Sequence, residues 1–140
     1  MTTIENREDD QIAAGVLTAW ADGIRVHEPE RVASLFADDA IFQGFDPEHT
    51  VGRAGVAAYY AKQPSGLIAT FSIVERRRPS ADTRVAYARV DFTLPDGHII
   101  PVHLTIVLGF TPEGWLISHY HVSKIEPTTG AGTPADSDRN

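Results

Sequence analysis

The hydrophobic pattern of this chain changes its period near the middle, and that change constrains the fold more than any other feature. Over residues 12–62 the apolar residues recur every three or four positions, as on one face of a helix. From about residue 68 they alternate with polar residues, as in strands that bury one face. Helices followed by a series of strands are typical of an α+β domain, and 140 residues suffice for one domain.

The first half predicts three helices and a short strand. Proline suits the first helical position, which is why the second helix is expected to begin at Pro29. The expected elements are, in order, a helix carried by Ile12, Val16 and Trp20, a helix from Pro29 through Phe36, a strand over 40–43, a loop over 45–52 and a helix over 53–62.

The second half predicts four strands separated by turns. The expected strands cover residues 68–77, 84–94, 99–111 and 115–126. The breaks between them contain Pro, Asp and Gly, which favour tight turns, so neighbouring strands should form antiparallel hairpins. Long strands twist and curl. We therefore expect a curved antiparallel sheet wrapped over the helices, a cone with an internal pocket.

Charge and cysteine content exclude several classes of protein. Nineteen acidic residues against twelve basic ones give a net charge of −7, which disfavours nucleic-acid and anionic-membrane partners. The chain has no cysteine, which excludes disulfides and thiolate metal sites and fits a cytoplasmic location. The N-terminal residues show no signal peptide. Residues 127–140 lack large apolar side chains and are expected to be a disordered tail that follows a domain over 8–126.

Three segments resemble a known superfamily. Residues 27–44 (HEPERVASLFADDAIFQG), 51–60 (VGRAGVAAYY) and 114–123 (GWLISHYHVS) resemble the NTF2-like, SnoaL-like superfamily, and within it the SgcJ/EcaC-type branch of polyketide and enediyne biosynthetic clusters. The resemblance covers about residues 8–126. It implies the NTF2-like cone, while the functions known for this superfamily range from isomerases and dehydratases to transport and association domains.

The last predicted strand carries two histidines two positions apart. Counted from Trp115, one face holds Ile117, His119, His121 and Ser123, and the resemblance places that face toward the interior. Histidine can move a proton near neutral pH, so His119 and His121 are candidate catalytic residues, with His121 the more sensitive to substitution. The alternative is that both only line a pocket wall or a dimer interface.

Asp91 is the leading candidate carboxylate. A carboxylate that faces an apolar cavity can act as acid or base. The alternative is that Asp91 shares a solvent-exposed face with Arg89. His103 has a similar ambiguity: if Phe110 pairs with Trp115 in a plain hairpin, His103 lies opposite to the two later histidines, and one bulge reverses that.

The remaining candidate ligand-binding residues are aromatic or polar: Trp20, Phe42, Tyr60, His103, Trp115 and Ser123. For Trp20 and Phe42, ordinary core packing is at least as good an explanation. A metal site of His103, His119 and His121 with Asp91 is conceivable from residue type, but an H-x-H pair alone is weak, and we expect no metal. No dinucleotide fingerprint or phosphate-binding loop is visible, so no cofactor is expected.

The sequence and the resemblance together predict a small-molecule pocket that serves polyketide or enediyne biosynthesis. The pocket would bind a hydrophobic intermediate or catalyse cofactor-free acid–base cyclisation, isomerisation or dehydration. The alternatives are a non-catalytic carrier and an oligomerising interaction domain. A homodimer through the outer sheet face is expected, on the assumption that this face is partly apolar.

Overall fold

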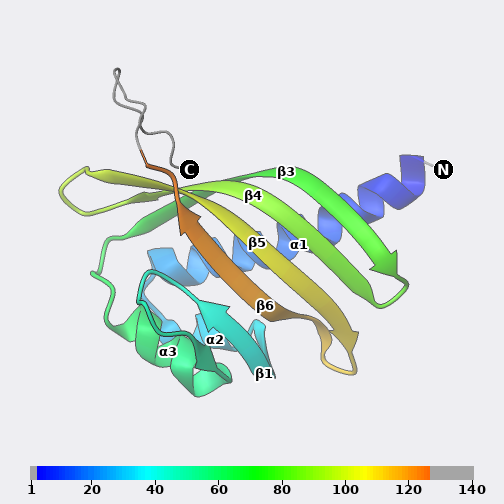
Figure 1. Cartoon of the computed structure of the whole chain (residues 1–140), viewed down its shortest axis with the longest axis horizontal. Coiled ribbons are helices and arrows are strands. Elements are labelled where there is room, and N and C mark those ends of the chain that lie inside the picture. Colours follow the sequence, from blue (N-terminus) through cyan, green and yellow to red (C-terminus); the bar gives the residue numbers. More distant parts are fainter. Residues whose placement is uncertain (1–2, 127–140) are drawn as a thin grey trace, which may run out of the picture.

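The computed structural model describes residues 3–126, with side chains from residue 11, and it contains three helices and one sheet in that part of the chain (Figure 1). The elements are α1 (Thr3–Arg25), α2 (Pro29–Ala33), β1 (Phe36–Gln43), β2 (Thr50–Val51), α3 (Arg53–Ala61), β3 (Ile68–Ser80), β4 (Thr83–Thr93), β5 (Ile99–Thr111) and β6 (Gly114–Lys124). The predicted tail over 127–140 lies outside the described residues.

The six strands form one curved sheet in the order β2-β1-β6-β5-β4-β3. The meander from β3 to β6 is antiparallel, and β1 joins it parallel to β6. Long α1 runs along one face of the sheet, and α2 and α3 lie near its β1 end (Figure 1). We call the helix-covered face the inner face and the opposite one the outer face. The α+β class and the curved sheet over helices confirm the prediction.

The core forms where the apolar side of each strand meets α1. Leu104, Ile106 and Leu108 of β5 are fully buried, as are Leu17 and Trp20 of α1. Burying a side chain of this kind contributes about 1.5–3 kcal/mol. Within residues 3–126, no helix combines the length and the apolar composition that crossing a bilayer requires.

The second helix is shorter than expected. It ends at Ala33, and Phe36 begins β1 instead of closing the helix. The cause is a tertiary contact with β6. Phe36 pairs with Ile117, and the Leu35 carbonyl accepts a hydrogen bond of 2.9 Å from the Ile117 amide. The prediction that this helix runs through Phe36 is therefore wrong.

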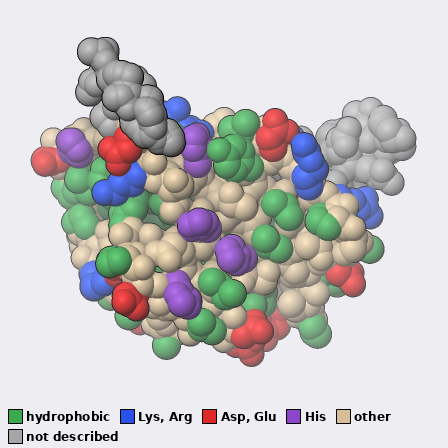
Figure 2. Space-filling view, in the orientation of Figure 1, with side chains coloured by type: hydrophobic (Ala, Val, Ile, Leu, Met, Phe, Trp, Pro, Cys, Tyr) green, Lys and Arg blue, Asp and Glu red, His purple; other side chains and the backbone are tan. Residues whose placement is uncertain are grey.

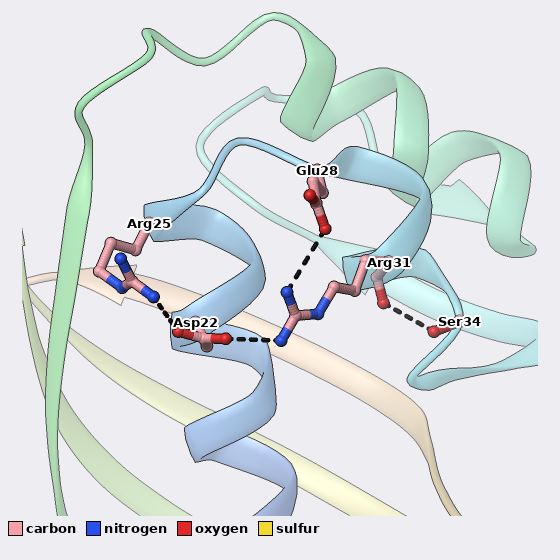
Figure 3. A network of polar contacts seen from close by, with 5 residues as sticks. All are labelled: Asp22, Arg25, Glu28, Arg31 and Ser34. Atoms are coloured by element: carbon pink, nitrogen blue, oxygen red, sulfur yellow. Dashed lines mark hydrogen bonds and ion pairs between the residues drawn. The ribbon is translucent and has the colours of Figure 1, made fainter.

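An ion-pair network holds the α1–α2 corner (Figure 3). Asp22 accepts hydrogen bonds from Arg25 on its own helix and from Arg31 on α2. Arg31 also pairs with Glu28 at 3.4 Å. The Arg25 guanidinium, with Arg31 beside it, lowers the pKa of Asp22 below its usual range. One carboxylate thus links the two helices.

A β-bulge in β6 decides which side chains reach the interior. Leu108 pairs with Ile117 and Val107 with His119, which leaves Ser118 as an extra residue. The Ser118 hydroxyl donates a hydrogen bond of 3.2 Å to the Val107 carbonyl. Because one extra residue reverses the alternation, Ile117 points inward while His119 points outward.

Candidate functional site

A cavity of about 70 Å³ lies between the inner sheet face and α3. It is close to the point where β4 ends and β5 begins. Its walls are aromatic and aliphatic apart from one amide and the tyrosine hydroxyls: Phe45, Tyr59, Tyr60, Gln63, Leu67, Phe92, Leu94, Ile100, Tyr120 and Val122. No carboxylate, imidazole or basic side chain is among these described lining residues.

A chain of three buried polar groups runs from the core to one wall of the cavity. The Trp20 indole Nε1–H donates to the Tyr60 hydroxyl at 3.0 Å, and the Tyr60 hydroxyl donates to that of Tyr120 at 3.1 Å. Trp20 and Tyr120 are almost fully buried, and Tyr60 is buried as well. The Tyr120 ring stacks on Phe42 at 4.5 Å between ring centres. These contacts fix the two hydroxyls in position.

Tyr59 supplies a third hydroxyl from the neighbouring position of α3. Its hydroxyl oxygen accepts a hydrogen bond of 3.0 Å from the backbone amide of Phe45. The ring lies so close to Gly44 that a Cβ there would sit 2.6 Å from the Tyr59 Cζ atom. Glycine at position 44 therefore allows the chain after β1 to close over this ring.

Burial favours the protonated form of all three hydroxyls. Desolvation raises the pKa of Tyr59, and it raises the pKa of Tyr60 and Tyr120 further above the ordinary tyrosine range. The wall therefore presents neutral hydroxyl groups near neutral pH, not phenolates.

Two lysines lie beside aromatic side chains of the cavity wall. The Lys124 ammonium lies 5.4 Å above the Phe45 ring, and the Lys62 ammonium 5.8 Å from the Tyr59 ring centre. Lys62 is also paired with Asp46 at 2.7 Å. Neither lysine lines the cavity itself.

The predicted histidines lie on the outer face. His119 and His121 point away from the helices, with ring centres 6.5 Å apart, and His121 is exposed. His103 shares this face, where its ring lies 5.4 Å from that of Tyr87. Figure 2 shows histidine side chains gathered near the middle of this face. The bulge at Ser118 lies between Trp115 and the two histidines and turns both imidazoles outward. The prediction that His119 and His121 face an enclosed pocket with Trp115 is therefore wrong.

Asp91 also lies on the outer face, next to Arg89, which is the alternative given for it in the sequence. Its Oδ1 atom is 3.6 Å from the Arg89 guanidinium and has no hydrogen-bond partner within the described residues. In that part of the chain no group of three His, Cys, Asp or Glu side chains could hold a metal ion. A catalytic role for His119, His121 or Asp91 stays a prediction, and it would require chemistry on the open outer face.

The other predicted ligand-binding residues are scattered. Tyr60 lines the cavity, whereas Trp20 and Phe42 lie behind its wall in the core. Trp115 lies at the β5–β6 turn, against Phe110 and under the Arg84 guanidinium. Ser123 is exposed and pairs with His103.

Tyr120 and Val122 line the cavity, although strict alternation from Trp115 places both on the outer side of β6. The signal that locates them is the continuous apolar side of β5, because Ile106 pairs with Tyr120 and Leu104 with Val122. Phe92 carries a similar signal as part of the apolar side of β4. Phe45 has no such periodic neighbours, so no pattern marks it.

Comparison with known proteins places this geometry in a family. The model of the SnoaL-like domain matches residues 14–127. No curated protein matches the chain. Among solved structures, an NTF2-like protein with a cystatin-like fold from Novosphingobium aromaticivorans superposes with a TM-score of 0.76 at 15% identity, over 91% of this chain and 89% of that one.

Two further structures have the same fold. A ketosteroid isomerase-like protein from Erwinia carotovora atroseptica gives a TM-score of 0.66 at 20% identity, over 84% of this chain and 98% of that one. A protein assigned as a calcium/calmodulin dependent protein kinase II association domain, from Xanthomonas campestris, gives 0.71 at 18% identity, over 83% and 87%. At these identities the similarity shows the fold alone.

Proposed function

We propose, from the premise that the chain belongs to the SnoaL-like domain family, that its cavity binds a small, neutral and largely apolar molecule without catalysing acid–base chemistry on it. The observation that carries the proposal is the composition of the wall, which is apolar apart from tyrosine hydroxyls and the Gln63 amide. General acid–base catalysis needs a group that can change its charge near the working pH. The described wall has none, which favours the carrier over the enzyme.

The size of the cavity limits the bound part of the ligand. About 70 Å³ exceeds the 10–15 Å³ that one water needs but is well below the 300–1,000 Å³ of common ligand pockets. A single small ring is therefore the largest group we expect to be enclosed without movement of the walls.

Xenon provides a direct test, because this small apolar atom enters dry apolar cavities. We expect xenon to shift the methyl resonances of Leu67 and Val122 in NMR spectra. Leu94→Trp should fill the cavity from its wall and abolish these shifts. Tyr87→Trp adds the same side chain to the outer face of β4, the strand that Leu94 follows, and should leave them intact. Xenon shifts absent from the wild type, or unchanged by Leu94→Trp, would contradict the proposal.

The biosynthetic setting is a finer proposal. We propose a polyketide-type or enediyne-type intermediate as the ligand, of which one ring enters the cavity. The support is the resemblance of residues 27–44, 51–60 and 114–123 to the SgcJ/EcaC-type branch. Genes for polyketide assembly next to the gene for this chain would support it. A neighbourhood without biosynthetic genes would count against it.

A second candidate function is homodimerisation through the outer face. This face is more polar than expected, since His103, Thr105 and His121 occupy its middle. Its central charges, Arg89 and Asp91, lie 3.6 Å apart and offset each other. In a chain with a net charge of −7, a locally neutral face lets a second copy approach without repulsion. The exposed Ile41 and Tyr87 add apolar area there.

A further inference from the structure

We infer that the ligand presents a hydrogen-bond acceptor, such as a ketone oxygen, to the tyrosine hydroxyls of the cavity. This inference rests on the proposed function, that the cavity binds a small molecule. It follows from counting protons in the wall, which contains more hydroxyl donors than the protein itself uses.

One hydrogen-bonded chain joins Trp20, Tyr60 and Tyr120. These groups carry one polar proton each, three in all. They form two hydrogen bonds with one another, from Trp20 to Tyr60 and between the two tyrosines. One proton is therefore left over, whichever way the bond between the tyrosines runs. Both tyrosines line the cavity, so that proton belongs to a wall residue in either case.

The direction of the chain assigns the remaining proton to Tyr120. The Tyr60 oxygen accepts from the Trp20 indole, which can only donate, and the Tyr60 hydroxyl donates to the Tyr120 oxygen. The Tyr120 proton then has no acceptor among the described residues. A buried donor without a partner costs free energy, which a ligand or a water can recover.

Tyr59 contributes a second donor. Its oxygen accepts the Phe45 amide proton, and its own hydroxyl proton has no acceptor among the described residues. Tyr59 and Tyr120 therefore each hold a proton available to a ligand. The only side-chain carbonyl in the wall is that of Gln63, whose amide nitrogen donates to the Tyr59 carbonyl at 3.3 Å.

These donors select a chemical class. A carbonyl oxygen has two lone pairs and can accept a hydrogen bond from either hydroxyl, while the rest of the ligand contacts the apolar wall at Leu67, Phe92 and Val122. A saturated hydrocarbon of the same shape would fill the cavity but leave both protons unpaired. The wall should therefore discriminate a small cyclic ketone from the matching hydrocarbon.

The test compares cyclopentanone with cyclopentane, measured as dissociation constants by NMR titration. For the wild type we expect the ketone to bind at least tenfold more tightly. In Tyr120→Phe and in Tyr59→Phe the ketone should lose roughly fivefold in affinity each, the amount typical of one hydrogen bond. Cyclopentane should bind both variants as it binds the wild type, which also shows that the cavity is intact.

Tyr87→Phe removes a hydroxyl from the outer face and is the matched control; it should change neither affinity. If both probes bind the wild type equally, the inference is overturned while the proposed binding function stands. If the variants keep the wild-type preference for the ketone, the assignment of the donors is overturned. If neither probe binds the wild type, the proposed function itself is overturned.

Discussion

Ile117 and His119 lie two positions apart on one strand and yet point to opposite faces of the sheet. Ile117 is fully buried against the core, whereas His119 pairs with Val107 on the outer face. The residue between them, Ser118, absorbs the change as a β-bulge. This single irregularity places Tyr120 in the cavity wall and both histidines outside it.

Replacing Ser118 tests the role of its hydroxyl in the bulge. Ser118→Ala removes the hydrogen bond to the Val107 carbonyl and should lower the free energy of unfolding by about 1 kcal/mol. Urea denaturation measures the change. Ser123→Ala, on the same strand but exposed, should stay within about 0.5 kcal/mol of the wild type. Equal effects of the two substitutions would show that the hydroxyl does not stabilise the bulge.

The fold was predictable because its strands have strong two-sided patterns. The alternation over residues 84–94 and 99–111 identified both segments as strands but left open which side of each is buried. The pairing of Phe110 with Trp115 is as a plain hairpin predicts. Each of these features depends on local sequence and on burial of one face.

The candidate site was less predictable because it depends on a long-range register. Counting by two from Trp115 leads to His121, and nothing in the segment around Ser118 marks the extra residue. The bulge follows from pairing with β5, where Leu104 and Ile106 require apolar partners. A sequence pattern within one strand cannot contain that requirement. For the same reason the second helix ended early, where Phe36 pairs with Ile117.

Asp22 should make the stability of the α1–α2 corner depend on pH in the acid range. Arg25 and Arg31 lower its pKa in the folded state, so the ion pairs stabilise the protein fully above the ordinary carboxyl pKa of 3.8. That contribution is lost as the pH falls through the lower, folded-state pKa. Asp22→Asn should destabilise the protein at pH 7 but not near pH 2, as measured by urea denaturation at both values.

Asp39→Asn is the control for Asp22, because Asp39 is exposed on β1. It should leave the pH dependence of unfolding as in the wild type. An Asp22→Asn protein with the wild-type stability at pH 7 would contradict the assigned role of this carboxylate.

The buried tyrosines should make stability fall in alkaline solution. Burial raises the pKa of Tyr60 and Tyr120 above the value of about 10 for unfolded chains. Above pH 10 the unfolded chain releases protons that the folded one retains, so the free energy of unfolding falls by up to about 1.4 kcal/mol per pH unit for each tyrosine. In urea denaturation between pH 8 and 11, Tyr120→Phe should show a shallower fall than the wild type. Tyr87→Phe, at a partly exposed site, should show the wild-type slope.

The outer face makes a prediction about assembly. If two copies pair through it, light scattering at micromolar concentration should give twice the chain mass of 15.3 kDa. Thr105 lies in the middle of this face, opposite His121 on β6 and Tyr87 on β4. Thr105→Arg should shift the protein to monomers, because pairing through this face would bury a new charge from each copy without a partner. Thr18→Arg makes the same change on an exposed position of α1 and should leave the dimer intact. Two outcomes would contradict dimerisation through the outer face: a wild type that is a monomer, or a dimer that survives Thr105→Arg but is broken by Thr18→Arg.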